Sequence, residues 1–161
     1  MITPIIVVLI LTSPLGLAWL FSRQTGRHLN TGFWATIGLA TTFIFFFVGH
    51  LVQTAGMVAM LPPWVPQRLA LVYATAVLEI LIAIGLLFED SRRPALLAAM
   101  AVLVLFYPAN IYAAWQQIDY AGYRWGLSYL WIRTPLQLLL LGWAYWMCWR
   151  PAQQQPSAMA V

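Results

Sequence analysis

A histidine and a glutamate lie inside apolar stretches of this sequence, where ionisable side chains are rare. His50 stands in FFFVGHLVQTAGM, and Glu79 stands in VYATAVLEILIAIGLLF. Such groups are costly in hydrocarbon and normally face a bundle interior, a partner or a water-filled cavity. A carboxyl group beside an imidazole offers a general acid and base, so Glu79 and His50 are our candidate catalytic residues.

The spacing of these two residues predicts that they lie at one depth. Between them stands LPPWVPQ, whose prolines block helix continuation because they fix φ and remove backbone donors. The midpoint of positions 50 and 79 falls inside that stretch. In an antiparallel hairpin with ~1.5 Å of rise per residue, both lie about 15 Å deep. We therefore expect His50 and Glu79 to meet, either as an ionised pair or with neutral Glu79 donating to His50.

The same arithmetic brings Asn110 and Gln137 to a common level, because their midpoint falls inside AGYRWG. Arg133 precedes Gln137 by about one helical turn. With His50 and Glu79, these three residues form a predicted polar ladder in one half of the bundle. Such a ladder has two explanations: polar contacts that hold helices together, or a ligand site with ionisable groups.

Neighbouring residues extend the candidate ligand-binding site. Gln53 and Thr54 follow His50 by three and four residues and so share its helix face. In PANIY, Pro108 is expected to bend its helix beside Asn110 and Tyr112. We expect a pocket entered between PPWVP and YAGYRWGLSY, and its expected apolar lining is Phe46, Phe47, Tyr73 and Phe106.

Composition predicts the elements that position these residues. The chain is 63% hydrophobic and 7% charged, whereas a soluble domain is about 45–50% apolar. We predict an all-α, polytopic transmembrane bundle with a single helical domain over 1–150 and a polar, disordered tail over 151–161. A span needs about 20 apolar residues. The five expected spans are 1–21, 33–60, 69–88, 95–115 and 131–149.

Arginine counts in the connections predict the orientation, since basic residues favour the cytoplasmic side. Five arginines fall on one side and three on the other, which predicts N-terminus out and C-terminus in. The two sets are Arg23, Arg27, Arg92, Arg93 and Arg150 against Arg68, Arg124 and Arg133. The first apolar segment is expected to be a retained helix, because its positive charges follow the apolar core instead of preceding it.

The sequence argues against several classes of function. It has no basic stripe or nucleic-acid motif, so we expect no nucleic-acid partner. Cys148 is the only cysteine, which leaves no internal disulfide or CxxC redox pair. His50 is the only histidine within an expected span, so neither bis-His haem nor a metal site is expected.

The sequence resembles the DoxX-like family of small membrane proteins over about residues 45–146. The resembling motifs, in order, are GH, MLPPWVP, VYATAVLEILIAIGLLF, RRPA, FYPANIYAA and RTPLQ. The resemblance implies a helical bundle in the bacterial cytoplasmic membrane, associated with membrane oxidoreductase systems that include a quinone-reducing thiosulfate enzyme. The family positions carried over are His50, Glu79, Pro108, Asn110, Arg133 and Gln137.

This chain departs from the family pattern in two ways. It adds a first helix to a four-helix core, and it lacks the cysteine pair of some relatives. A redox role would therefore need a bound quinone or a membrane or periplasmic oxidoreductase partner. Three functions stay open: an accessory subunit that binds a quinone or similar lipophile, a stand-alone enzyme or carrier, and a structural or assembly factor. No cofactor other than a quinone is implied, and a homo-oligomer stays open.

Overall fold

The computed structural model describes residues 2–26 and 30–149, and these residues form an all-helical chain without strands. The predicted tail at 151–161, and Arg27, His28 and Arg150, lie outside the described residues. The elements are α1 (Ile2–Thr25), α2 (Thr31–Val52), α3 (Thr54–Ala59), α4 (Arg68–Leu87), α5 (Glu89–Trp115), the 3-10 helix η1 (Tyr123–Tyr129) and α6 (Leu130–Trp149).

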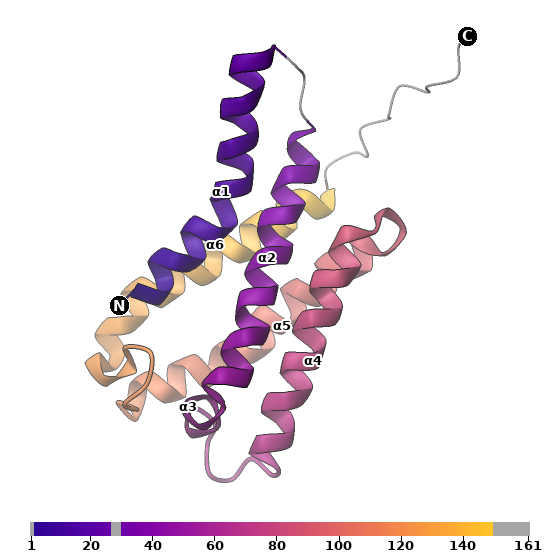
Figure 1. The fold of residues 1–161 in the computed structure, drawn as a ribbon. Helices are drawn as coiled ribbons and strands as arrows, with labels where there is room; N and C mark the ends of the chain where they lie inside the picture. The colour runs from indigo at the N-terminus through magenta and orange to yellow at the C-terminus, as the bar shows by residue number, and fades with distance from the viewer. Residues whose placement is uncertain (1, 27–29, 150–161) are drawn as a thin grey trace.

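The long helices form a ring with one helix outside it. In Figure 1, α2 stands between α1 and α4, while α5 and α6 cross behind them. Packing runs from α2 to α4, from α4 to α5, from α5 to α6 and back from α6 to α2, and α1 covers α2 and α6. Aliphatic residues fill this ring, including Leu39, Leu86, Leu96 and Leu140, each at most 2% exposed. The four-helix core with an added first helix therefore matches the expected architecture.

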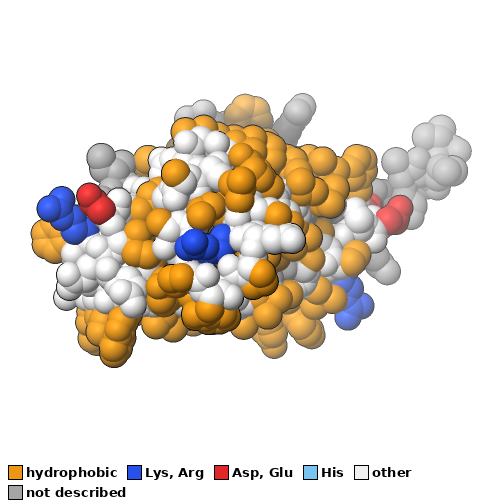
Figure 2. All heavy atoms as spheres, turned by 90° about the horizontal axis from the view of Figure 1, so that it is seen from below, with side chains coloured by type: hydrophobic (Ala, Val, Ile, Leu, Met, Phe, Trp, Pro, Cys, Tyr) orange, Lys and Arg blue, Asp and Glu red, His pale blue; other side chains and the backbone are white. Residues whose placement is uncertain are grey.

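Among the residues that the structure describes, four helices are long and apolar enough to cross a membrane, namely α1, α2, α4 and α5. At most 39% of the residues in each apolar window are buried within the protein, so most of these residues are partly or fully exposed. Large apolar surface on the outside of long helices indicates a membrane protein. Hydrophobic side chains also cover much of the face at the end with the α3–α4 loop, where charged groups are few (Figure 2). The 20-residue α6 is not among the four, because Arg133 and Gln137 lower its hydropathy.

The expected helix over 33–60 is interrupted, which corrects the prediction of one continuous span. The backbone leaves the helical region at Gln53, with φ −120° and ψ 33°. The Thr54 hydroxyl then donates to the carbonyl of His50 at 2.6 Å. Side chains of this kind compete with the helical hydrogen bonds and bend helices. The expected break at LPPWVPQ is confirmed, since α4 begins only at Arg68.

The expected spans 69–88 and 95–115 leave residues 89–94 as a connection, but these residues are instead the start of α5, and Pro94 lies inside that helix. The helix begins at Glu89, directly after Phe88. Ser91 Oγ donates to the carbonyl of Gly85 at 2.8 Å, and Arg92 Nε donates to the carbonyl of Leu86 at 3.3 Å. These side chains satisfy the last carbonyls of α4, so a longer loop is not needed.

Close packing of α1 on α2 depends on Gly38. A Cβ at this position would lie 2.1 Å from the backbone oxygen of Leu11. We expect Gly38→Ala to lower the free energy of unfolding by at least about 1 kcal/mol, because the backbones must separate. A Cβ at Gly16 in α1, by contrast, would meet no neighbouring atom within 4 Å. Gly16→Ala should therefore be neutral or stabilising, and unfolding in detergent that ranks the two variants equally would contradict the close approach.

Candidate functional site

A cavity of about 410 Å³ lies inside the helix ring, within the range of small-molecule sites. Its walls come mainly from α2, α4, α5 and α6, with Thr3 and Ile6 of α1 and Met57 of α3 also in contact with it, and the connection between α5 and α6 closes one side. Most of the lining is apolar, and Phe46 and Phe106 belong to it as expected. The candidate residues that line it are His50, Gln53, Glu79, Asn110, Arg133 and Gln137. The polar ladder therefore faces a space large enough for a ligand.

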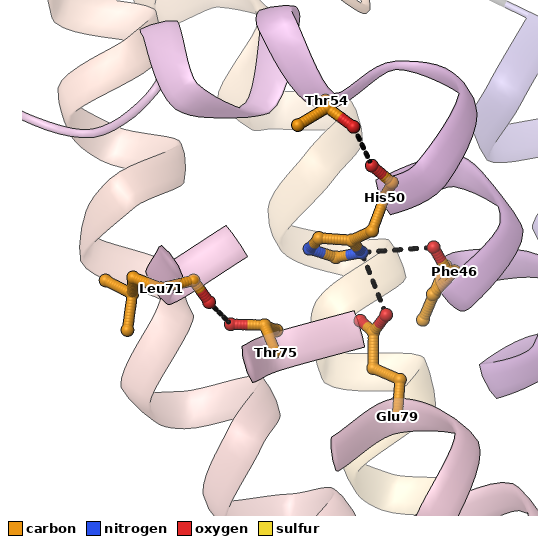
Figure 3. A network of polar contacts seen from close by, with 6 residues as sticks. All are labelled: Phe46, His50, Thr54, Leu71, Thr75 and Glu79. Carbon is orange, nitrogen blue, oxygen red and sulfur yellow. Dashed lines mark hydrogen bonds and ion pairs between the residues drawn. The ribbon is translucent and has the colours of Figure 1, made fainter. Parts of the chain in front are cut away.

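His50 and Glu79 meet across α2 and α4, as the hairpin arithmetic predicts. Nδ1 of His50 lies 2.8 Å from Oε2 of Glu79 and 3.0 Å from the carbonyl oxygen of Phe46 (Figure 3). The carbonyl can only accept, so this contact places a proton on Nδ1. That favours the state in which His50 carries the Nδ1 proton over the state in which neutral Glu79 donates to Nδ1.

The single Nδ1–H of His50 cannot be directed at both the Phe46 carbonyl oxygen and the Glu79 carboxylate. Hydrogen-bond geometry is met at Phe46, whereas Oε2 of Glu79 is close to Nδ1 but lies away from the N–H direction and has no hydrogen bond. The short distance therefore records a close contact between the two side chains and not a directed hydrogen bond. Nε2, the other ring nitrogen of His50, points away from Glu79 (Figure 3). Since Nδ1 is protonated, Nε2 of a neutral ring offers a lone pair.

Asn110 is held by the α5–α6 connection and not by Gln137. Tyr123 in η1 donates its hydroxyl proton to Oδ1 of Asn110 at 2.5 Å. Tyr123 packs edge-on against Tyr129, with ring centroids 4.9 Å apart, and both are 1% exposed. Burial raises the pKa of Tyr123 to about 12, against the opposing charge of Arg133. Tyr123 therefore stays a neutral donor that fixes Asn110 against the cavity.

Gln137 and Arg133 line the same wall with different environments. The Gln137 amide donates to the backbone carbonyl of Leu103 across the α5–α6 interface. Arg133 has no ion pair within residues 2–26 and 30–149, and its buried Nε lacks a hydrogen-bond partner. A buried donor without an acceptor costs about 1–3 kcal/mol, and more when it is charged. The Nε–H of Arg133 is thus left without an acceptor among the described residues, while the Tyr123 hydroxyl lies within hydrogen-bonding reach of the same guanidinium.

Four expected positions do not line the cavity: Phe47, Thr54, Tyr73 and Tyr112. On a helix, residues one or two apart point about 100° or 200° apart. Tyr112 is therefore turned away from the face of Asn110, and Tyr73 from the face of Thr75. Thr54 instead bonds the backbone of α2 at the helix break. These four side chains are corrected as site residues.

The structure adds residues that sequence spacing did not single out. Tyr120, Tyr123 and Tyr129 line the cavity from the α5–α6 connection, and Met57 and Met60 line it from α3 and its end. The positive charge of Arg133 opposes the rise that burial causes in the pKa of Tyr120 and of Tyr129. The only sequence signal for the tyrosines was their density in YAGYRWGLSY. This segment was expected at the entrance of the pocket, but no role was assigned to any single tyrosine.

A close contact ties α3 to the α5–α6 connection at the cavity wall. A Cβ on Gly56 would lie 2.2 Å from a ring carbon of Tyr120. We expect Gly56→Ala to displace this ring and to weaken ligand binding by about 1 kcal/mol, the scale of overpacking. Gly142→Ala is the matched control, since a Cβ there meets nothing within 4 Å. Equal affinities of the two variants in a ligand titration would show that Tyr120 does not shape the cavity.

Fold and site together define an all-helical protein of membrane character with a mostly apolar cavity that carries a few polar and charged side chains. The chain belongs to the family described as Domain of unknown function (DUF8561), whose model matches residues 39–148. The match begins inside α2, so α1 lies outside it, whereas the cavity-lining ladder lies within it. No curated protein and no solved structure matches the chain. No group of three or more metal-ligating side chains occurs among the residues that the structure describes.

Proposed function

We propose that this chain is a DoxX-like membrane protein that binds a small lipophile, with quinones as the first class to test, and serves a membrane oxidoreductase as an accessory subunit. The observation that carries the proposal is the mostly apolar cavity of about 410 Å³ with Arg133 in its wall. A quinone carbonyl would fit such a site, because it could accept a hydrogen bond from the Nε–H of Arg133, which has no acceptor among the described residues. His50 and Glu79 would hold or pass a proton at the same ligand.

We further propose five spans, with α6 as the fifth, in a bacterial cytoplasmic membrane. Its 20 residues suffice in length, and its partner α5 is itself apolar enough to span. Arg23, Arg92 and Arg93 lie at the helix ends opposite the α3–α4 loop, while Arg68 and Arg124 lie towards that loop. By the positive-inside rule, this favours N-terminus out and C-terminus in.

Cysteine accessibility tests the orientation. On a Cys148→Ala background, single cysteines placed at Asp90 and at Asp119 should differ in labelling by an impermeant maleimide. We expect labelling at Asp119 from outside intact cells, and labelling at Asp90 only after permeabilisation. The reverse pattern would overturn the proposed orientation and move the cavity to the other half of the membrane.

Gentle purification followed by mass spectrometry of the bound lipids and proteins tests the function. The proposal predicts a lipophile, together with an oxidoreductase partner, in repeated preparations. A bound lipophile without any partner would favour a stand-alone binding protein or enzyme and refute the accessory role. If no lipophile co-purifies and no quinone binds on titration in nanodiscs, the proposal is refuted and a structural role is favoured.

A further inference from the structure

Two buried side-chain atoms lack a hydrogen-bond partner in the described part of the chain, and both belong to charged groups of the same cavity. One is Oε2 of Glu79, an acceptor, and the other is Nε of Arg133, a donor. They come from α4 and α6, so no single helix end explains them. Buried polar atoms are normally paired, and exceptions call for a cause. Oε2 of Glu79 accepts no hydrogen bond although His50 is close to it, and the Nε–H of Arg133 has no acceptor.

The other titratable groups around the cavity do not compensate the charge of Arg133 at close range. The titratable groups that line it are His50 from α2, Glu79 from α4, Arg133 from α6, and three tyrosines of the α5–α6 connection. Tyr123 is neutral at physiological pH. Arginine stays protonated in proteins, so Glu79 is the only group able to balance it inside the cavity. Yet Glu79 contacts His50 and not Arg133.

We infer that the cavity is built for an acidic lipophile, such as a quinone ring with an acidic hydroxyl, which binds as its anion at Arg133 while one proton rests on the His50–Glu79 pair. The ligand O–H bond breaks, its electron pair stays on the ligand oxygen beside the guanidinium, and the proton forms a new O–H bond on the Glu79 carboxylate. A ligand that is already ionised in water brings no proton, and the same carboxylate then takes one from solvent.

A neutral quinone satisfies only half of this arrangement. Its carbonyl can accept from Arg133, but it brings neither a negative charge for the guanidinium nor a proton for Glu79. An acid supplies both at once: its anion compensates the guanidinium and its proton neutralises the carboxylate, so neither separated charge is left uncompensated, which would be costly away from water. The inference rests on the proposed function, since it requires that the cavity holds a lipophile.

Two probes of nearly the same shape separate the inference from the proposed function. We would titrate the full chain in nanodiscs with 2-hydroxy-1,4-naphthoquinone, which is acidic, and with 2-methoxy-1,4-naphthoquinone, which is not. The hydroxyl compound should bind at least about tenfold more tightly. Calorimetry in two buffers of different ionisation enthalpy should show uptake of about one proton per ionised ligand bound.

Variants test separately the proton uptake by Glu79 and the binding of the ligand anion by Arg133. Glu79→Gln should abolish proton uptake, and Arg133→Gln should remove the preference for the acidic probe. Arg124→Gln is the control, because Arg124 is exposed and does not line the cavity. Equal affinity for both probes, or tight binding of the acid without proton uptake, would overturn the inference and leave lipophile binding intact. Binding of neither probe would refute the inference and count against the proposed function as well.

Discussion

Replacing Arg133 with alanine is expected to weaken ligand binding by about 10- to 100-fold, because a charge-assisted hydrogen bond contributes about 1.5–3 kcal/mol. The guanidinium is the strongest donor in the cavity wall, and its Nε has no acceptor among the described residues. The loss should appear in the dissociation constant measured by titration in nanodiscs. Unfolding in detergent should change little, because Arg133 forms no ion pair with any residue that the structure describes.

Arg124 provides the matched control for this prediction. Its side chain is 77% exposed and lies 3.9 Å from Asp119, outside the cavity. Arg124→Ala removes the same charge from the same end of the bundle. An equal loss of affinity in both variants would mean that Arg133 acts only through the general positive potential. Unchanged affinity in Arg133→Ala would mean that the polar ladder is structural.

The second large effect concerns the buried pair. His50→Leu is expected to lower the free energy of unfolding by about 3–5 kcal/mol, because it leaves the Glu79 carboxylate buried alone. Glu79 is 5% exposed, and His50 is its only contact of opposite charge in the described chain. The double variant His50→Leu, Glu79→Leu should regain most of this loss, since two apolar side chains leave no charge to solvate.

A double-mutant cycle measures the coupling directly. Unfolding midpoints of the wild type, both single leucine variants and the double variant give the interaction energy, which we expect at about 0.5–3 kcal/mol in favour of the pair. Single variants whose losses simply add would show that the 2.8 Å contact carries no energetic coupling. The pair would then be incidental to the fold.

The contact between His50 and Glu79 could be predicted because it depends only on helix rise and a proline-rich turn. His50 and Glu79 both lie within helices, and LPPWVPQ separates those helices, so counting residues from the turn predicted their contact correctly. The partner of Asn110 could not be counted in this way. The α5–α6 connection folds as η1, with Gly126 at φ 65°, and brings Tyr123 inward. Counting along a helix does not describe a connection that re-enters the bundle.

Helix boundaries were predicted less well than helix contacts. Residues 89–94 are charged and contain proline, which favours a loop, but Ser91 and Arg92 satisfy the end of α4 and let α5 begin at once. At Gln53, where the helix breaks, there is no proline or glycine that would predict the break. In both places, side-chain hydrogen bonds to nearby backbone carbonyls decided where the helix stopped or started. Such bonds depend on tertiary geometry that residue type alone does not give.

The central claim is that the cavity holds a lipophile through Arg133, and native mass spectrometry of the protein released from nanodiscs tests it most directly. Thr75 is 5% exposed and lines the cavity, so Thr75→Trp fills the space while leaving every charged group in place. We predict a bound lipophile on the wild type and on Arg124→Ala, and its loss from both Thr75→Trp and Arg133→Ala. The same adduct on all four proteins, or none on the wild type, would contradict the claim.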